Sequence, residues 1–150
     1  MKKHLSMAAL VLATVCMIPT AHANLNQSGV SWHAMYAADA SSINYRASGV
    51  ENWSASSKPI IGAVNYAYNS GGISMYVDGT NYNGASTSVT VYSYDYNGYY
   101  LSGQSATLTG TYDRWFGLTT AQAPQWAFVS VYANLPPNAN GLFRGVTSLY

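Results

Sequence analysis

Few side chains in this sequence could act as acids, bases or nucleophiles. The 150 residues include five Asp or Glu, three His and one Cys. A Ser-His-Asp hydrolase would need His33 as its base, since His4 and His22 lie at the extreme N-terminus, and no Gly-x-Ser-x-Gly motif accompanies it. His33 follows Trp32 in an apolar, aromatic stretch, which favours a packed or surface histidine over a catalytic base.

The acidic residues do not supply the two placed carboxylates that a glycosidase requires. Asp78 and Asp95 stand in turn-like sequences, where Asp usually shapes the backbone, and Asp113 adjoins Arg114 as in an exposed ion pair. A zinc site would need His33 with several carboxylates, and no spacing indicates one. We therefore predict no catalytic residue, no metal site, no cofactor and no enzymatic activity. The acidic residues are Asp39, Glu51, Asp78, Asp95 and Asp113.

Two short segments contain oxygen atoms of the kind that bind calcium. They are residues 78–83, which read Asp-Gly-Thr-Asn-Tyr-Asn, and residues 95–97, which read Asp-Tyr-Asn. Neither matches the spacing of an EF-hand loop. Turn formation explains both segments without a bound ion.

The most distinctive segment is residues 89–101, which carries five tyrosines. Its Asn97-Gly98 pair favours a two-residue type I′ turn, because both positions of that turn need positive φ. In the resulting register, Tyr96 pairs with Tyr99, Asp95 pairs with Tyr100, and Tyr94 pairs with Leu101 across the two strands.

In that register one face of the hairpin carries four tyrosines, and Val89 and Val91 lie on the other face. One interpretation is cross-strand packing, each pair contributing ~0.2–1 kcal/mol and partly covered by a loop. The other is an exposed platform on which sugar rings stack. Packing is favoured because tyrosine is common in strands, and a slip of one residue would remove the platform. The candidate ligand-binding residues are Tyr92, Tyr94, Tyr96 and Tyr99.

Alternating apolar and polar residues, separated by turn sequences, indicate an all-β domain. An antiparallel β-sandwich of the jelly-roll or immunoglobulin-like kind is expected, with a small β-barrel as the alternative. The predicted strands are residues 30–36, 43–47, 49–53, 60–66, 73–77, 88–94, 99–103, 106–112, 127–135 and 143–149. The predicted turns are residues 69–72, 78–79, 97–98 and 136–141.

Two segments support this fold class most strongly. Residues 73–77 place aliphatic side chains on one face and polar ones on the other, as a half-buried strand requires. Residues 126–135 are apolar on both faces, which favours a central strand, and the Pro136-Pro137 pair after them ends strand pairing.

The first 23 residues have the layout of a cleaved signal peptide. Lys2 and Lys3 precede an apolar run over residues 5–18, and Ala21-His22-Ala23 forms an A-x-A cleavage site. The apolar run is shorter than the ~20 residues that span a bilayer. Cleavage after Ala23 would remove Cys16 and leave one domain, residues 24–150, without disulfides. We expect this domain to be secreted or periplasmic.

Charged residues make up 7% of the chain, against about 25% in an average soluble protein. Such a chain has no basic patch for phosphates, so neither nucleic acid nor anionic lipid is an expected partner. A surface of Ser, Thr, Asn and Tyr is instead compatible with uncharged partners such as polysaccharides.

The order of short motifs resembles that of a group of small secreted β-sandwich proteins of unknown function from Gram-negative and related bacteria. The matching motifs are a strand at residues 30–36, Gly-Val-Glu-Asn at 49–52 and Lys-Pro-Ile-Ile at 58–61, followed by the Asp-Tyr-Asn-Gly hairpin at 95–98 and Val-Tyr-Ala-Asn-Leu-Pro-Pro at 131–137. Several core positions that are often cysteine in that group, including the one matching Ala133, are not cysteine here. The resemblance implies a β-sandwich and no particular activity.

These observations favour a non-enzymatic secreted domain that binds a neutral polysaccharide or a surface protein. A structural component of a matrix or surface assembly is the first alternative, because a low-charge chain rich in Tyr, Asn, Gly and Ser pairs strands readily between molecules. A small outer-membrane β-barrel is the second alternative. It fits an exported, tyrosine-rich chain, but most predicted strands are shorter than the ~9–11 residues that span a membrane.

Overall fold

The computed structural model describes residues 25–66 and 72–149. The expected signal peptide, its cleavage site and most of the predicted turn at 69–72 lie outside these residues. Within the described part, no helix is long and apolar enough to cross a membrane.

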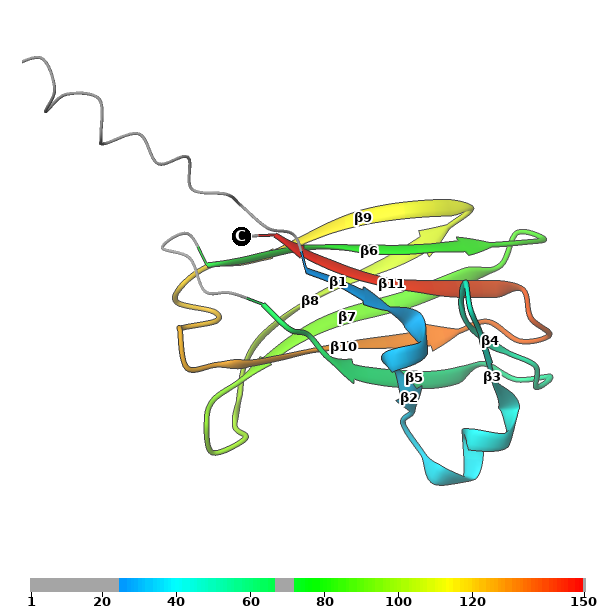
Figure 1. Cartoon of the computed structure of the whole chain (residues 1–150), viewed down its shortest axis with the longest axis horizontal. Coiled ribbons are helices and arrows are strands. Elements are labelled where there is room, and N and C mark those ends of the chain that lie inside the picture. Colours follow the sequence, from blue (N-terminus) through cyan, green and yellow to red (C-terminus); the bar gives the residue numbers. More distant parts are fainter. Residues whose placement is uncertain (1–24, 67–71, 150) are drawn as a thin grey trace, which may run out of the picture.

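Two antiparallel sheets pack face to face (Figure 1). The first sheet has the order β3-β4-β11-β6-β9, with β1 paired to β11 as well, and the second has the order β2-β5-β10-β7-β8. The first sheet contains β1 (Leu25–Ser28), β3 (Ile43–Arg46), β4 (Gly49–Asn52), β6 (Ile73–Asn81), β9 (Thr111–Leu118) and β11 (Gly141–Leu149). The second contains β2 (His33–Ala34), β5 (Lys58–Ala63), β7 (Ser86–Tyr94), β8 (Tyr100–Thr109) and β10 (Phe128–Leu135). Two short 3₁₀ helices, η1 (Gly29–Ser31) and η2 (Ala37–Ser42), flank β2.

The connectivity is that of a jelly roll. From β4 to β11 the chain alternates between the sheets except at the β7–β8 hairpin, which gives the strand orders 4-11-6-9 and 5-10-7-8. The expected antiparallel sandwich is therefore confirmed, and of the two kinds considered the jelly roll is the one observed. β1, β2 and β3 extend this framework at its edges.

The core lies between the sheets and is built by strands that alternate strictly. On β10, the central strand of its sheet, Val129, Val131, Ala133 and Leu135 point inward and are buried. Valines of β7 lie beside them in the same sheet, and apolar residues of β6 face them from the opposite sheet. The predicted central place of β10 and the half-buried pattern of residues 73–77 are both confirmed.

Trp32 is the largest fully buried side chain. Its indole Nε1 donates a hydrogen bond to the carbonyl of Val131 at 3.1 Å, and its ring packs against Phe143 of the other sheet at a centroid distance of 5.4 Å. Gly62 makes room for it, because a Cβ there would lie 2.7 Å from the indole ring. Trp32 thus ties the two sheets together.

Several strand boundaries differ from the prediction. Residues 78–79 do not form a turn but continue β6, because the phenol of Tyr112 packs against Gly79 where any side chain would clash. The break expected near residues 104–105 is absent. β8 runs on to Thr109, and the chain reverses at Gly110, whose φ is 59°. The predicted strand at 30–36 is reduced to the two residues of β2, since η1 and η2 occupy its flanks.

The phenol of Tyr112 is buried without a hydrogen-bond partner among the described residues. The nearby hydroxyl of Thr87 donates instead to Oδ1 of Asn81 at 2.7 Å. Burial raises the pKa of Tyr112 to about 12 from its ordinary value of 10.0. The hydroxyl therefore loses its hydration on folding and gains nothing in return.

Removing this hydroxyl should not destabilise the protein. We expect Tyr112→Phe to leave the free energy of unfolding at pH 7 unchanged or raise it by up to ~1 kcal/mol. Because the pKa of Tyr112 is higher in the folded than in the unfolded protein, folding favours the protonated phenol. The contribution of this group to the free energy of unfolding is therefore fully present below pH 10 and is lost as the pH rises toward 12. Urea unfolding should show wild type losing up to about 2–3 kcal/mol more than the variant over that range. A variant destabilised by more than about 1 kcal/mol at pH 7 would contradict this account.

Candidate ligand-binding site

The outer face of the second sheet carries a continuous group of aromatic side chains. Because the valines of β7 and β10 point into the core, the residues between them must point outward. On β7 these are Tyr92 and Tyr94, and on β10 they are Phe128 and Tyr132. Strand pairing brings Tyr94 opposite Phe128 across the two strands.

Three tyrosines pack against one another on this face. The ring centroids of Tyr92 and Tyr94 are 6.1 Å apart, and Tyr100 of β8 lies 6.3 Å from each of them, edge-on to both. Gly103 lies beneath this triangle, because a Cβ there would touch the ring of Tyr92 at 3.2 Å and the hydroxyl of Tyr100 at 3.4 Å. Tyr92, Tyr94, Tyr100, Phe128 and Tyr132 are named the aromatic face from here on.

The turn of the hairpin differs from the predicted type I′ turn, and this changes the register. Only Gly98 has a positive φ, of 85°, and Asn97 does not. Asp95 controls the turn: its Oδ1 accepts hydrogen bonds from the backbone N–H groups of Asn97 and Tyr99, both at 2.8 Å. The backbone N–H of Asp95 also donates to the Tyr99 carbonyl, which closes a three-residue loop.

The longer loop shifts the partner of Tyr94 by one residue. Tyr94 pairs with Tyr100 rather than Leu101, and the ladder has an irregularity between Ser93 and Tyr94. Of the four predicted site residues, Tyr92 and Tyr94 therefore lie together, whereas Tyr96 and Tyr99 are in the loop. Tyr100 joins the cluster, whereas Tyr96 and Tyr99, which the predicted register placed there, do not.

The loop tyrosines extend the aromatic surface on one side only. Tyr96 is 71% exposed and packs edge-on against Trp126 at a centroid distance of 5.8 Å, next to the start of β10. Tyr99 is also 71% exposed and is not part of these ring contacts. Tyr96 and Trp126 thus form a rim beside the aromatic face.

The members of the aromatic face differ in how far they are open to solvent. Phe128 is 63% exposed and Tyr100 is 61% exposed, whereas Tyr92, Tyr94 and Tyr132 are half-buried. Burial raises the pKa of Tyr94, with further contributions from the Tyr92 and Tyr100 phenols. The Tyr94 phenol therefore stays neutral under ordinary conditions, presenting an apolar ring with a hydroxyl that can donate or accept.

Tyr132 extends the aromatic face from the hairpin towards the β2 edge of the same sheet. Burial raises its pKa, and the phenols of Tyr36 and Tyr92 raise it further, which places Tyr132 between them. Tyr36 follows β2 and is exposed. Aromatic groups therefore continue across the sheet from the hairpin towards β2.

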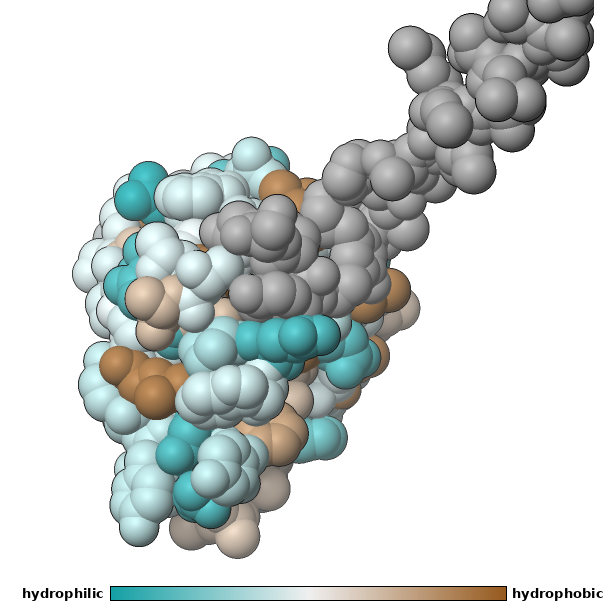
Figure 2. Space-filling view, turned by 90° about the vertical axis from the view of Figure 1, so that its left-hand side faces the viewer, coloured by the Kyte–Doolittle hydropathy of each residue, from teal (hydrophilic) through white to brown (hydrophobic). Residues whose placement is uncertain are grey.

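This face belongs to the uncharged part of the molecule. β7, β8 and β10 contain no Asp, Glu, Lys or Arg, whereas the strands of the other sheet carry Arg46, Glu51, Asp78, Asp113, Arg114 and Arg144. Figure 2 views the sandwich from the end where the β7–β8 loop lies. There the described surface is mostly pale, with hydrophobic colour in small separate areas. The aromatic face can thus contact a neutral ligand without displacing charge.

The remaining candidate groups do not assemble into a reactive centre. His33 is exposed on β2, opposite Ile61, as the surface-histidine interpretation expects. Among the described residues, no three His, Cys, Asp or Glu side chains converge on one point. Of the two segments with oxygen atoms of the kind that bind calcium, residues 78–81 belong to β6 and residues 95–97 form the Asp95 turn.

Two acidic residues form ion pairs and two others lie side by side. Glu51 bonds Arg46 at 2.5 Å, and Lys58 bonds Asp39 at 2.6 Å. The expected Asp113–Arg114 pair is wrong, because alternation sends these neighbours to opposite faces of β9.

Asp113 instead lies opposite Asp78 on β6. Burial and the Asp113 carboxyl raise the pKa of Asp78, while Arg144 lowers it. No local sequence pattern predicts this contact, because the two residues are far apart in the chain.

No family model matches this sequence, and no curated protein matches it. Two solved structures are similar in architecture. One is the xylan-binding module CBM15, with 12% identity, a TM-score of 0.53, and coverage of 85% of this chain and 96% of the module. The other is TmCBM61 in complex with β-1,4-galactotriose, with 11% identity, a TM-score of 0.47, and coverage of 87% and 88%. The likeness to the CBM15 module shows a shared β-sandwich fold.

Proposed function

We propose that this protein is a secreted, non-enzymatic domain that binds a neutral polysaccharide on the aromatic face. The observation that carries the proposal is the ring cluster of Tyr92, Tyr94 and Tyr100, with Phe128 paired opposite Tyr94, on strands without a charged residue. A sugar ring has an apolar face and a rim of hydroxyls, and a phenol ring complements both features. The fold likeness to a module named for xylan binding makes xylan the first ligand to try.

The geometry also indicates a polymer rather than a single sugar. Aromatic rings form two clusters, Trp126 with Tyr96 and Tyr92 with Tyr94 and Tyr100, and Tyr132 lies near Tyr92. Two clusters offer more than one stacking position to a single polymer chain. Each contact on its own is weak, and occupying them together raises the affinity.

Removal of two rings tests the proposal directly. We expect Tyr94→Ala with Tyr100→Ala to weaken retention by xylan or another neutral polymer about tenfold or more in affinity electrophoresis, because the ligand loses two apolar contacts. The matched pair is Trp126→Ala against Trp115→Ala, since these side chains are 51% and 50% exposed, but Trp126 lies in the turn before β10 and Trp115 lies on β9 of the other sheet. Only the Trp126 variant should lose affinity.

The choice of polymer adds a second criterion. Binding should be retained in 1 M salt and should favour xylan and hydroxyethyl cellulose over polygalacturonate, because the aromatic face has no charge. Equal loss in the Trp115 and Trp126 variants, or binding only to the polyanion, would contradict the proposal.

We expect the Asp95 turn to affect binding only by holding the residues of the β7–β8 hairpin in position. Asp95→Ala removes the acceptor for the Asn97 and Tyr99 N–H groups, whereas Asp95→Asn keeps an acceptor oxygen in the same place. We expect the alanine variant to lose ~1–2 kcal/mol of unfolding free energy and to bind polymer more weakly, and the asparagine variant to lose less of both. Urea unfolding and affinity electrophoresis measure the two effects. Unchanged binding in a destabilised alanine variant would show that the turn does not position the site.

Structural self-assembly remains a second candidate, favoured by one specific feature. β8 is an edge strand of ten residues without a charged side chain, whereas β9, the corresponding edge of the other sheet, carries Asp113 and Arg114. Charged side chains on an edge strand oppose pairing with another molecule, and β8 lacks this protection.

Sedimentation velocity separates the two candidates. A protein that assembles through β8 should sediment faster as its concentration rises, and Thr107→Lys with Thr109→Lys, both exposed on β8, should abolish the effect. A monomer at every concentration would exclude assembly through this edge. The neutral-polymer proposal predicts that monomer.

A further inference from the structure

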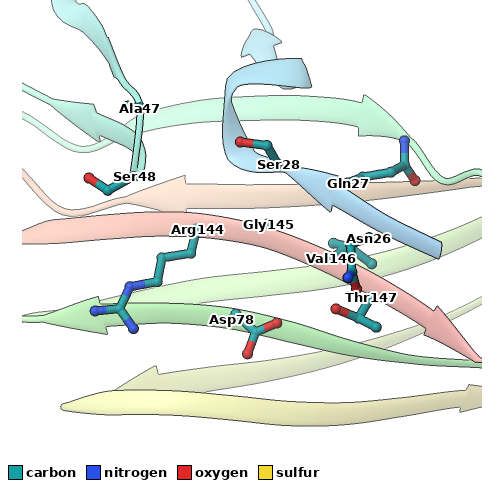
Figure 3. A pocket seen from close by; sticks show the side chains of 10 residues that line it. All are labelled: Asn26, Gln27, Ser28, Ala47, Ser48, Asp78, Arg144, Gly145, Val146 and Thr147. Atoms are coloured by element: carbon teal, nitrogen blue, oxygen red, sulfur yellow. The ribbon is translucent and has the colours of Figure 1, made fainter. Parts of the chain in front are cut away.

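Arg144 occupies a β-bulge in β11, on the sheet opposite the aromatic face. The pairing of β11 with β6 shifts between Phe143 and Gly145, so that Arg144 is the extra residue. A bulge of this kind interrupts the regular alternation and re-aims one side chain. Here it directs the guanidinium outward, across β6 (Figure 3).

Three glycines hold the bulge in place. Gly145 has a φ of 150°, and a Cβ there would lie 2.1 Å from the carbonyl oxygen of Gln27. Gly29 and Gly49 both press against the carbonyl of Phe143, where a Cβ would come within 2.3 Å. Because β1, η1 and β4 all close on this one point, the position of Arg144 is fixed by the framework and not by a loop.

The bulge borders an open pocket of about 460 Å³. This volume falls within the range of small-molecule sites, ~300–1,000 Å³. The polar side chains around it come from four different segments, as Figure 3 shows. They are Asn26, Ser28, Ser48, Asp78, Arg144 and Thr147.

Arg144 and Asp78 line the same pocket without forming an ion pair. The guanidinium lowers the pKa of Asp78, so the two groups are close enough to interact electrostatically. Yet within the described residues the ion pairs shorter than 4 Å are Arg46–Glu51 and Lys58–Asp39. The guanidinium nitrogens of Arg144 and the carboxyl oxygens of Asp78 therefore lie more than 4 Å apart.

The charges around this space select the kind of group that fits. Asp78 and its neighbour Asp113 oppose the single positive charge of Arg144, so the site has no excess positive charge to attract an anion. A hydroxyl can donate to a carboxylate and accept from a guanidinium at the same time. Two adjacent hydroxyls would use both oxygens of the carboxyl and two N–H groups of the guanidinium.

We propose that the pocket at the Arg144 bulge is a second carbohydrate site, which holds one neutral sugar unit by two adjacent hydroxyls placed between Arg144 and Asp78. Ser48 and Thr147 supply further hydroxyl contacts at its wall. The site lies on the opposite sheet from the aromatic face and takes a chain end or side branch instead of a polymer backbone. It shares with the proposed function only the class of ligand, and each site can fail without the other.

Amide chemical shifts of the ¹⁵N-labelled protein locate such binding. Methyl β-D-xylopyranoside and methyl β-D-galactopyranoside at up to about 100 mM, a range suited to millimolar affinity, should move the signals of Ser48, Gly145 and Thr147. Cyclohexanol has a similar ring but a single hydroxyl, so it should leave these signals in place. The Tyr94→Ala, Tyr100→Ala double variant should respond at the pocket as wild type does.

Three substitutions test the roles of the two charged groups. Asp78→Asn and Arg144→Met should each weaken the pocket response about tenfold, since each removes a charged hydrogen-bonding partner. Arg144→Lys keeps the charge but loses the planar pair of donors, and it should also weaken the response. Arg114→Met, at an exposed residue of β9 outside the pocket, is the control and should leave the response unchanged. A dispersed spectrum of each variant confirms that it folds.

The proposal is overturned if neither glycoside moves the pocket signals, if cyclohexanol moves them equally, or if the response survives Asp78→Asn and Arg144→Met. Shifts confined to Tyr92, Tyr94 and Tyr100 would leave the aromatic-face proposal standing and remove this one. Shifts at the pocket without any retention by polymers would leave the pocket proposal standing and remove the aromatic-face proposal.

Discussion

The alternation of β7 and β10 is the constraint from which the surface of this protein follows. Val89 and Val91 on β7 are fully buried, as is Val131, which pairs with Val91 on β10, and burying each such side chain contributes roughly 1.5–3 kcal/mol. Because successive side chains on a strand point to opposite faces, burial of the valines forces Tyr92 and Tyr94 outward. A one-residue slip would bury the tyrosines and expose the valines, so the position of the aromatic face is tied to the stability of the core.

The two outer faces of the sandwich consequently differ in chemistry. On β7, β8 and β10 of the second sheet, neutral aromatic rings are held against one another by cross-strand packing, and these three strands carry no charged residue. On the first sheet, charged residues either pair, as Glu51 does with Arg46, or surround the Arg144 bulge that three glycines fix in place. A single domain of this size therefore offers an aromatic surface on one side and a polar pocket on the other, and our two proposals assign them to different parts of a carbohydrate.

The sequence was sufficient where local rules decide the structure. Alternation predicted the inward faces of β6 and β10, and the many short strands predicted the sandwich. It was insufficient where a contact distant in sequence overrides a local preference. Asp-Gly at 78–79 reads as a turn, but Tyr112 packs on Gly79 and keeps the strand straight. Asn-Gly at 97–98 reads as a two-residue turn, but the Asp95 side chain captures two backbone N–H groups and lengthens the loop.

The site was predicted only in part for the same reason. The register error exchanged Tyr100 for Tyr96 and Tyr99, and no local pattern could pair Phe128 with Tyr94 across β10 and β7. The most direct test of the central claim is a crystal structure with a neutral xylo-oligosaccharide bound. Our account predicts sugar rings stacked over Tyr94, Tyr100 and Phe128. An oligosaccharide bound away from these rings, with the aromatic face left in solvent, would contradict it.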